Sequence, residues 1–508
     1  MERSPAMGRI VIAEVETTLP EFDTKVARAM TGLARLGVRE GSAVLLLLRN
    51  DIAFLVAAQA VSRLGAYPVP ANWHNKPDEI AVMLRDSGAE CAVAHADLAR
   101  SHLAGSGMAV VVVRPPGADG DGLGGEQGWI AWEAMIAESE PYTGAPVPQR
   151  GALIYTSGTT SAPKAIDRAA MTPAQAEAMA ESQCLTYGFR PGMRALICGP
   201  LYHSMTMSYA FTTLRTMGGD GVLFVETRFD ERRMLELVAR ERITHLLMVP
   251  VMFIRLLRLD PTERAAYDVS SIEAVTHSAA PCSREVKEAM VAWWGPVLRE
   301  FYGASESGPV TLLAGEEYLR KPGSVGRPMA GCTVHILGEE GTVLPAGESG
   351  EIAVRNGSYP EFTYRHRPEE RAKLDRGGLI ATGDIGCLDE EGFLFLRDRK
   401  KDMIITGGVN VYPAEIEGII LERPEVRDCA VFGIPDTEFG ESMAAHIELC
   451  AGVDPDLEAM RRHLTDRLAK YKIPKVIRFT EGLPRDDNGK IAKRHLAAPY
   501  WTDQGRRP

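Results

Sequence analysis

Short apolar runs alternate with helical periods from residue 40 to about residue 300, and this alternation restricts the fold more than any other feature of the sequence. Strand–helix alternation favours parallel sheets that are covered by helices, with functional loops at the carboxyl ends of the strands. The predicted strands are Ala43–Leu48, Tyr67–Pro70, Glu90–Ala94, Val222–Val225, Thr244–Val249, Glu273–Thr276 and Val297–Phe301. The predicted helices are Asp51–Leu64, Asp78–Asp86, Asp230–Arg240, Met252–Leu259 and Ser283–Trp293. We therefore predict the α/β class, with a large N-terminal domain of helix-covered, mostly parallel sheets.

The sequence changes in character after Tyr302. Glycines become frequent, and segments such as Thr333–Leu337 and Gly350–Arg355 lie between them, which indicates a β-rich subdomain with tight turns. A charged run, Arg397–Asp402, follows Gly392–Leu396, and we place a domain boundary in it, although a solvated turn would give the same pattern. Beyond the run we predict a small α+β C-terminal domain with strands at Cys429–Gly433 and Ala445–Leu449 and a helix at Leu457–Lys470.

Composition and charge exclude several classes of protein. The 508 residues carry 57 Lys and Arg against 68 Asp and Glu, and the net charge of −11 argues against a protein built to bind nucleic acid or anionic lipid. A chain that is 45% hydrophobic and 25% charged is globular rather than disordered. No apolar run approaches the length of a membrane span, and the first ten residues lack the apolar core of a signal peptide. Eight scattered cysteines without CxxC spacing indicate neither a zinc site nor a disulfide framework. We expect a soluble, cytoplasmic protein.

Two motif matches lack the context that their function requires. Gly120–Gly125 fits GxGxxG, but Pro115 and Pro116 precede it and no helical pattern follows, so we interpret it as a surface loop. Ser161–Lys164 fits the SxxK of penicillin-binding enzymes, but no SDN or KTG partner is present, and Pro163 interrupts the helix that the motif needs.

The segment from Thr156 to Lys164 has the composition of a phosphate-binding loop. It follows the apolar run Ala152–Tyr155, and five of its nine residues carry hydroxyl groups. Hydroxyl donors, backbone N–H groups around Gly158 and one ammonium group suit a polyphosphate that must be held while charge moves on it. An ordinary Ser/Thr loop has the same composition, so the segment alone leaves both interpretations open.

This segment resembles the phosphate-binding loop of the adenylate-forming superfamily, which includes acyl- and aryl-CoA synthetases, peptide-synthetase adenylation domains and beetle luciferases. Other motifs of the superfamily follow in order over nearly the whole chain. They are Tyr302–Glu306 for YGxTE, Thr382–Asp384 for TGD, Asp398–Arg399 with Thr406–Gly408 for the hinge and the loop beyond it, and Pro484–Lys490 for PxxxxGK. The resemblance implies an N-terminal domain over residues 1–397, a hinge over residues 398–401 and a mobile C-terminal domain over residues 402–508.

The sequence departs from the superfamily pattern at three places. Ser161 replaces the usual Gly of TTGxPK, Ser305 replaces Thr in YGxTE, and Ser278–Pro281 stands where GGAP is common. Each replacement keeps a small side chain or a hydroxyl group, so we expect nucleotide binding to survive.

The resemblance implies a site for ATP and Mg²⁺. Tyr302 would lie against adenine, Asp384 and Arg399 would bind the ribose, Lys164 would hold the β- and γ-phosphates, and Glu306 would hold Mg²⁺. The residues implied to bind ATP are Thr156, Ser157, Gly158, Thr159, Thr160, Lys164, Ser278, Ala279, Ala280, Tyr302, Gly303, Ser305, Asp384 and Arg399. Without the other motifs, Asp384 would be interpreted as an ordinary turn residue.

The resemblance also implies two half-reactions that use the C-terminal domain differently. Lys490 would bridge the substrate carboxylate and the α-phosphate during adenylation, so Lys490, Lys164 and Glu306 are the predicted catalytic residues. Lys401 would lie in the hinge that then rotates the domain. Gly407 and Gly408 would line the channel for the pantetheine of coenzyme A, although a tight turn would also favour glycine there.

The predicted acid-binding residues are His203, Tyr209 and Gly308, and a core histidine is the alternative for His203. The stretch Pro200–Ser208 contains no acidic residue, which disfavours an amino acid, and Met205 and Phe211 favour an apolar acid, although core packing would also use them. His277–Cys282 and Trp293–Pro296 resemble segments of bacterial CoA ligases that act on aromatic or bulky cyclic acids. The resemblance therefore implies an ATP-dependent ligase that joins a hydrophobic, aromatic or bulky cyclic carboxylic acid to coenzyme A. A fatty acid, a separate carrier protein as acceptor, a catalytically inactive nucleotide sensor and a homodimeric assembly stay open.

Overall fold

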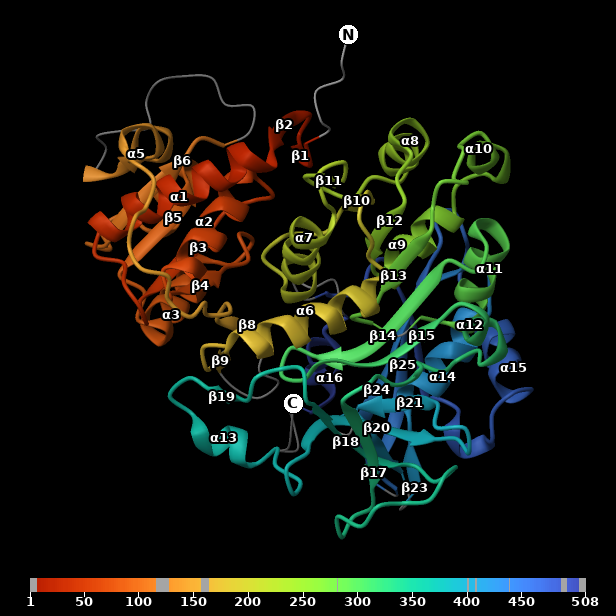
Figure 1. The fold of residues 1–508 in the computed structure, drawn as a ribbon. Helices are drawn as coiled ribbons and strands as arrows, with labels where there is room; N and C mark the ends of the chain where they lie inside the picture. Colours follow the sequence, from red (N-terminus) through yellow and green to blue (C-terminus); the bar gives the residue numbers. More distant parts are fainter. Residues whose placement is uncertain are drawn as a thin grey trace.

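Two sheets covered by helices on both faces, one parallel and the other parallel in its centre, contain most of the elements up to about residue 320 (Figure 1). The structure is a computed structural model that describes residues 7–115, 128–156, 164–280, 282–399, 402–406, 409–437, 439–485 and 491–501. The smaller of the two sheets has five strands in the order β4-β3-β5-β6-β7, and all of its neighbouring strands are parallel. Its elements are β3 (Ala43–Leu47), β4 (Tyr67–Pro70), β5 (Cys91–His95), β6 (Ala109–Val113) and β7 (Ile130–Ala131), with α1 (Leu19–Arg35), α2 (Ile52–Arg63), α3 (Pro77–Ser87), α4 (Ala96–His102) and α5 (Trp132–Glu138).

The larger sheet has nine strands in the order β16-β15-β14-β13-β12-β10-β11-β1-β2, and its central strands are parallel. Its strands are β1 (Arg9–Ile12), β2 (Val15–Thr18), β10 (Arg194–Ile197), β11 (Val222–Val225), β12 (His245–Met248), β13 (Ala274–His277), β14 (Leu298–Ala304), β15 (Gly308–Ala314) and β16 (Arg327–Pro328). Its helices are α6 (Pro173–Tyr187), α7 (Ser204–Thr216), α8 (Glu231–Glu241), α9 (Pro250–Leu257), α10 (Pro261–Ala265), α11 (Arg284–Trp294) and α12 (Glu316–Arg320).

The central parallel strands of both sheets are buried on both faces, whereas the edge strands β2 and β16 of the large sheet are largely exposed. Along β3, Val44 and Leu46 join the core that lies between the two sheets, whereas Leu45 and Leu47 pack toward α3 and α4. Successive strand residues point to opposite faces, so a strand with helices on both sides must be apolar throughout. This explains why these strands are unbroken apolar runs in the sequence.

Three smaller sheets complete the fold below and behind the large sheet in Figure 1. The β-rich subdomain contains β17 (Cys332–Leu337), β18 (Gly350–Asn356), β20 (Ile380–Leu388) and β21 (Leu394–Arg399). A three-stranded sheet contains β8 (Ile154–Thr156), β9 (Lys164–Arg168) and β19 (Phe362–Tyr364), which α13 (Pro368–Ala372) follows. The last sheet contains β22 (Ile404–Thr406), β23 (Val409–Val411), β24 (Val426–Asp436), β25 (Gly440–Leu449) and β26 (Val476–Thr480), with α14 (Pro413–Leu421), α15 (Leu457–Thr465) and α16 (Lys493–Trp501).

The predicted fold class is confirmed. The predicted elements differ from the observed ones at their ends, and the hairpin of β1 and β2 was not predicted. The helices predicted to begin at Asp51, Asp230 and Ser283 begin one residue later, because these three side chains cap the helix and accept hydrogen bonds from its first backbone N–H groups. The helix predicted to reach Lys470 ends at Thr465. Lys472 lies in a separate 3₁₀ turn and pairs with Glu415 at 2.6 Å, a tertiary contact that periodicity does not reveal.

The charged run that contains the predicted domain boundary begins inside a strand. Residues 397–399 belong to β21, which pairs with β20, and residues 400 and 401 lie outside the described part of the chain. Two hydrophobic clusters, whose first residues are Ile404 and Ala430, contain no described residue from the N-terminal sheets. The hinge over residues 398–401 stays a prediction.

Buried histidines should make the fold sensitive to acid. Burial lowers the pKa of His245 and His446, and it lowers the pKa of His277 to about 3, from an ordinary value of 6.5. The unfolded chain binds protons that the folded chain excludes, so the free energy of unfolding should fall as the pH drops below about 6.5. His277→Gln can keep a hydrogen bond to Tyr318. It should reduce the slope of the free energy of unfolding against pH by an amount that corresponds to the uptake of up to about one proton on unfolding. Denaturant titrations between pH 7.5 and 5 measure the slope, and an unchanged slope would contradict the assignment to His277.

Candidate active site

Three predicted segments leave the large sheet at the carboxyl ends of its parallel strands. Ser278–Ala280 follows β13, Tyr302 and Gly303 lie at the end of β14, and His203 directly precedes α7, after β10. In parallel sheets these ends lie along one edge, where ligand sites form. Side chains connect the segments, because the Ser278 hydroxyl donates to the Phe301 carbonyl at 2.7 Å. The hydroxyl groups of Ser204 and Ser305 lie 3.3 Å apart.

The predicted adenine and ribose residues are in direct contact. The Tyr302 hydroxyl donates to Oδ2 of Asp384 at 2.6 Å, which joins β14 to β20. Asp384 lies opposite Arg399 in the pairing of β20 with β21. The Asp384 N–H also donates to the Thr382 hydroxyl at 3.2 Å, so the first residue of the TGD motif holds its last one. Tyr302 and Asp384, which are 82 residues apart in the chain, therefore meet at one point.

Tyr364 connects the predicted phosphate lysine with the predicted magnesium ligand. Its hydroxyl donates to Oε1 of Glu306 at 2.9 Å, and its ring lies 5.4 Å from Nζ of Lys164. Burial and the neighbouring Glu306 carboxylate raise the pKa of the Tyr364 hydroxyl, which therefore stays a donor. Lys164 also forms an ion pair with Glu370 at 2.6 Å. The sequence reasoning did not identify Tyr364 or Glu370.

Arg168 fixes the backbone that carries Glu306, and the sequence reasoning missed it as well. Its Nη2 donates to the carbonyl of Ser305 at 2.9 Å and to the carbonyl of Glu306, and its Nη1 donates to the carbonyl of Pro360. Residues two apart in a strand share a face, so Lys164 and Arg168 lie on the same face of β9. That spacing is the signal by which the sequence could have revealed Arg168, had β9 been recognised as a strand.

Two glycines at the site allow a close approach that no other residue permits. A Cβ on Gly303 would lie 2.1 Å from the carbonyl oxygen of Gly308. Gly308 has a φ of +67°, and a Cβ there would lie 2.5 Å from the ring of Tyr359. Tyr359 therefore closes one side of the predicted acid-binding position.

The departure from the GGAP pattern places an alanine where the backbone favours glycine. Ala279 has a φ of +75°, in the left-handed region that costs a side-chain-bearing residue roughly 1 kcal/mol or more. The backbone conformation that the superfamily's glycine allows is therefore kept, at the cost of local strain.

The two predicted acid-binding residues on the α7 side differ in their surroundings. His203 is the residue before the helix, half-buried, with its ring centroid 4.5 Å from that of Tyr202. Tyr209 is fully buried, and its ring packs against Tyr187 at 5.0 Å and Phe189 at 4.7 Å. Tyr209 thus lies on the face of α7 that is buried in the core, and a role in acid binding stays a prediction.

Several predicted residues cannot be placed. Ser157, Gly158, Thr159, Thr160, Lys401, Gly407, Gly408 and Lys490 lie outside the described residues, together with the Gly120–Gly125 motif. Thr156 ends β8 opposite Lys164, so the described ends of the predicted phosphate loop are neighbours.

The residues at this edge fit Mg²⁺ bound through a nucleotide. Among the described residues no group of three or more His, Cys, Asp or Glu side chains gathers in the manner of a metal cage. Mg²⁺ is commonly held by one or two carboxylates together with substrate phosphates, and Glu306 beside Lys164 supplies such a carboxylate.

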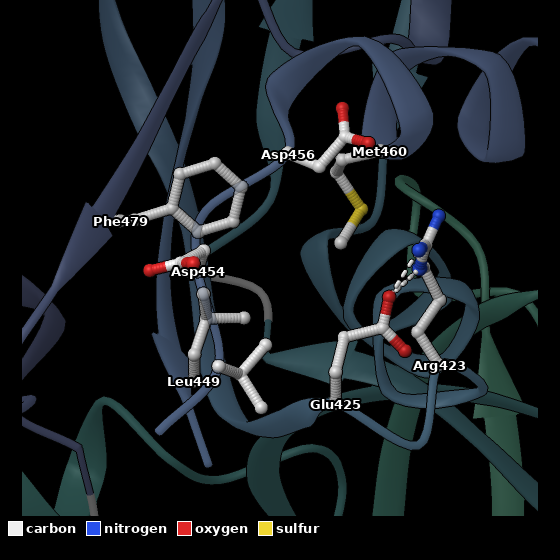
Figure 2. Close-up of a pocket in the computed structure, with 8 residues that line it drawn as sticks. Arg423, Glu425, Leu449, Asp454, Asp456, Met460 and Phe479 are labelled. Atoms are coloured by element: carbon white, nitrogen blue, oxygen red, sulfur yellow. Dashed lines mark hydrogen bonds and ion pairs between the residues drawn. The ribbon is translucent and has the colours of Figure 1, made fainter. Parts of the chain in front are cut away.

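A small cavity of about 140 Å³ in the C-terminal sheet region contains none of the predicted residues (Figure 2). Leu449, Met460 and Phe479 form its apolar part, and Arg423 and Glu425 lie side by side in its wall, joined to each other. The Nε of Arg423 donates to Oε1 of Glu425 at 2.5 Å, so the charge of the guanidinium is already compensated. The cavity offers no chemistry that resembles the edge of the large sheet.

The sheets, the β-rich subdomain and the site at the strand ends define an adenylate-forming enzyme. The chain belongs to the AMP-binding enzyme family, whose model matches residues 2–359, and the model of the AMP-binding enzyme C-terminal domain matches residues 415–490. The resemblance inferred from the motifs is confirmed. None of the helices in the described ranges has the length and apolar content needed to cross a bilayer.

Similar proteins include enzymes with different acids in their names. The chain is 31% identical to long-chain-fatty-acid–CoA ligase FadD13 of Mycobacterium tuberculosis, over 96% of this chain and 94% of that protein. It is 32% identical to feruloyl-CoA synthase of Amycolatopsis sp, over 94% and 92%. Among solved structures it is similar to o-succinylbenzoate CoA synthetase (MenE) of Bacillus subtilis in complex with the acyl-adenylate intermediate OSB-AMP, with a TM-score of 0.80, 26% identity and coverage of 98% and 95%.

A substitution of Glu306 tests whether this residue binds Mg²⁺. Glu306→Gln should raise the Mg²⁺ concentration that gives half-maximal activity, because a neutral amide is a poorer ligand for a hard dication. Excess Mg²⁺ should restore part of the rate. Glu316→Gln, which removes an exposed carboxylate of α12, is the matched control. A Glu306→Gln enzyme with an unchanged Mg²⁺ dependence would contradict the assignment.

Proposed function

We propose that the protein is an ATP-dependent carboxylate–CoA ligase that first forms an acyl-adenylate. In the first half-reaction a carboxylate oxygen attacks the α-phosphorus of ATP, and pyrophosphate leaves. In the second, the thiol of coenzyme A attacks the acyl carbon, and AMP leaves. The reaction that the names of the three similar enzymes share supports this proposal.

The observation that carries the proposal is the convergence of Tyr302, Asp384 and Lys164, from the strands β14, β20 and β9, with Glu306, from the turn after β14, onto one region. Tyr302 would offer its ring to adenine, and Asp384 would accept hydrogen bonds from the ribose hydroxyls. Lys164 would bind the departing phosphates. Glu306 would hold Mg²⁺, which neutralises charge on the phosphates when it is bound. Lys490 would offset the repulsion between the carboxylate and the α-phosphate.

For the acid we propose a hydrophobic, aromatic or bulky cyclic carboxylate. Half-buried Met205, Met207 and Phe211 of α7 support an apolar partner, and no acidic side chain of Pro200–Ser208 is available for an amino group. Tyr359, against Gly308, would limit the length of the acid. A fatty acid substrate and a carrier protein as acceptor are the alternatives.

A panel of carboxylic acids tests this proposal directly. Aromatic, cyclic, branched and straight-chain acids are supplied with ATP and Mg²⁺, and release of AMP is measured with and without coenzyme A. We expect compact aromatic or cyclic acids to give CoA-dependent AMP release and CoA thioester. Adenylate formation without any CoA thioester would favour a carrier protein, and a preference for long alkyl acids would favour the fatty acid alternative.

The two half-reactions should separate when Lys490 is removed. Lys490→Ala should abolish acyl-adenylate formation, with a loss of roughly 100-fold or more, because a positioned cation in the transition state is lost. Thioester formation from acyl-adenylate that is supplied directly should stay largely intact and serves as the internal control. Pyrophosphate exchange and thioester yield are measured on the same preparation, and an equal loss of both would contradict a separate role for Lys490.

A further inference from the structure

The predicted phosphate lysine already holds a carboxylate partner. Nζ of Lys164 lies 2.6 Å from Oε2 of Glu370, and the two side chains are only 17% and 27% exposed. Glu370 belongs to α13, which follows β19, and β19 pairs with β9, the strand that Lys164 begins. The same antiparallel pairing that positions Tyr364 therefore also carries Glu370 to Lys164.

Glu370 is held between two ammonium groups. Lys164 contacts one of its carboxylate oxygens and Lys373 contacts the other. Hydrogen bonds from Lys164 and then from Lys373 lower the pKa of Glu370 to about 2. The carboxylate is thus ionised at any pH at which an enzyme of this kind would work, and it is a permanent anion beside Lys164.

A phosphate oxygen and the Glu370 carboxylate would compete for the same ammonium group. Lysine binds anions as a compact point charge, so the energy of its ion pair depends on which anion lies closest. The Tyr364 ring lies beside Lys164, and the Tyr364 hydroxyl donates to Glu306. Lys164 is therefore held between the Tyr364 ring and the Glu370 carboxylate. Binding of a triphosphate at Lys164 must weaken or break the pair with Glu370.

We propose that Glu370 is a positioning residue that competes with the terminal phosphates for Lys164 and takes the lysine back as pyrophosphate leaves. This inference rests on the proposed function, because it uses the assignment of Lys164 to the phosphates. Glu370 weakens the binding of ATP and of pyrophosphate, and it speeds the release of pyrophosphate. Faster release leaves pyrophosphate in the site for a shorter time, so less of the acyl-adenylate is converted back to ATP before the second half-reaction.

The neighbouring residue Glu369 provides a matched control. Glu369 is exposed on the same short helix, and Glu369→Gln removes the same charge one residue away. Glu370→Gln should lower both the KM for ATP and the inhibition constant for pyrophosphate by about fivefold, the size expected for loss of one competing ion pair of this exposure. The kcat of Glu370→Gln should fall where pyrophosphate release limits turnover. Glu369→Gln should change the KM for ATP, the inhibition constant for pyrophosphate and kcat by less than about twofold each. Glu370→Asp keeps the charge on a shorter side chain and should lie between the wild type and Glu370→Gln.

Calorimetric titration with ATP and with pyrophosphate, each with Mg²⁺, provides a readout that needs no acid substrate. Both ligands should bind more tightly to Glu370→Gln, and the difference from the wild type should shrink at high salt, because screening weakens the competing pair. A purely structural ion pair would lower the melting temperature and leave both affinities unchanged, which would overturn the proposal. Weaker binding of both ligands would overturn it too, because Glu370 would then orient Lys164 for the phosphates instead of competing with them.

The same titrations separate this inference from the proposed function. If the wild type binds ATP and Glu370→Gln binds it more tightly, the competition is supported even when no acid gives a CoA thioester. If the wild type makes CoA thioester and the two affinities do not differ between the variants, the ligase function stands and the role of Glu370 is wrong. If the wild type binds neither ATP nor pyrophosphate, both are overturned.

Discussion

The antiparallel pairing of β9 with β19 is the contact on which the candidate active site depends. It joins segments about 190 to 200 residues apart in the chain, with Phe362 opposite Arg168 and Tyr364 opposite Ile166. Because the side chains of a strand alternate, this register places Tyr364 next to Lys164 and positions α13 so that Glu370 can reach the same lysine. A shift by one residue would turn Tyr364 to the other face and separate it from Glu306.

The parallel sheet supplies the other half of the site by a different physical route. Its strands are fixed by burial on both faces, so the loops at their carboxyl ends are held on a rigid edge. Ser278 and Tyr302 are positioned there by backbone hydrogen bonding and by packing of the core. The β-rich subdomain then brings Asp384 to Tyr302 through β20. The predicted nucleotide site is thus an interface between subdomains, and no single element contains it.

The parts of this arrangement that a local pattern records could be predicted from the sequence. The starts of three helices were predicted within one residue, at the capping residues Asp51, Asp230 and Ser283. Tyr302 and Asp384 were predicted from short motifs, and the structure brings them into contact. Arg168, Tyr364 and Glu370 lie in no motif. They reach the site through strand pairing across long stretches of chain, and the energy of that pairing is spread over backbone hydrogen bonds that carry no residue-specific signal. The hairpin of β1 and β2 was missed for the same reason, since its short strands gain their stability from the edge of the large sheet.

Charge balance explains why a site for a polyphosphate should contain carboxylates at all. Lys164 is paired with Glu370, Arg168 is used by backbone carbonyls, and Glu306 is held by Tyr364, so the described cations around the predicted phosphate position already have partners. ATP would therefore replace partners that these cations already have, such as the Glu370 carboxylate at Lys164, instead of filling a site of uncompensated positive charge. Very tight binding of the triphosphate or of pyrophosphate would lower the ground state and slow release without helping the chemical step, because only interactions that strengthen in the transition state raise the rate. A lysine shared between a fixed carboxylate and a departing phosphate binds most strongly when negative charge on the leaving group is greatest, and it returns to the carboxylate once that group has gone.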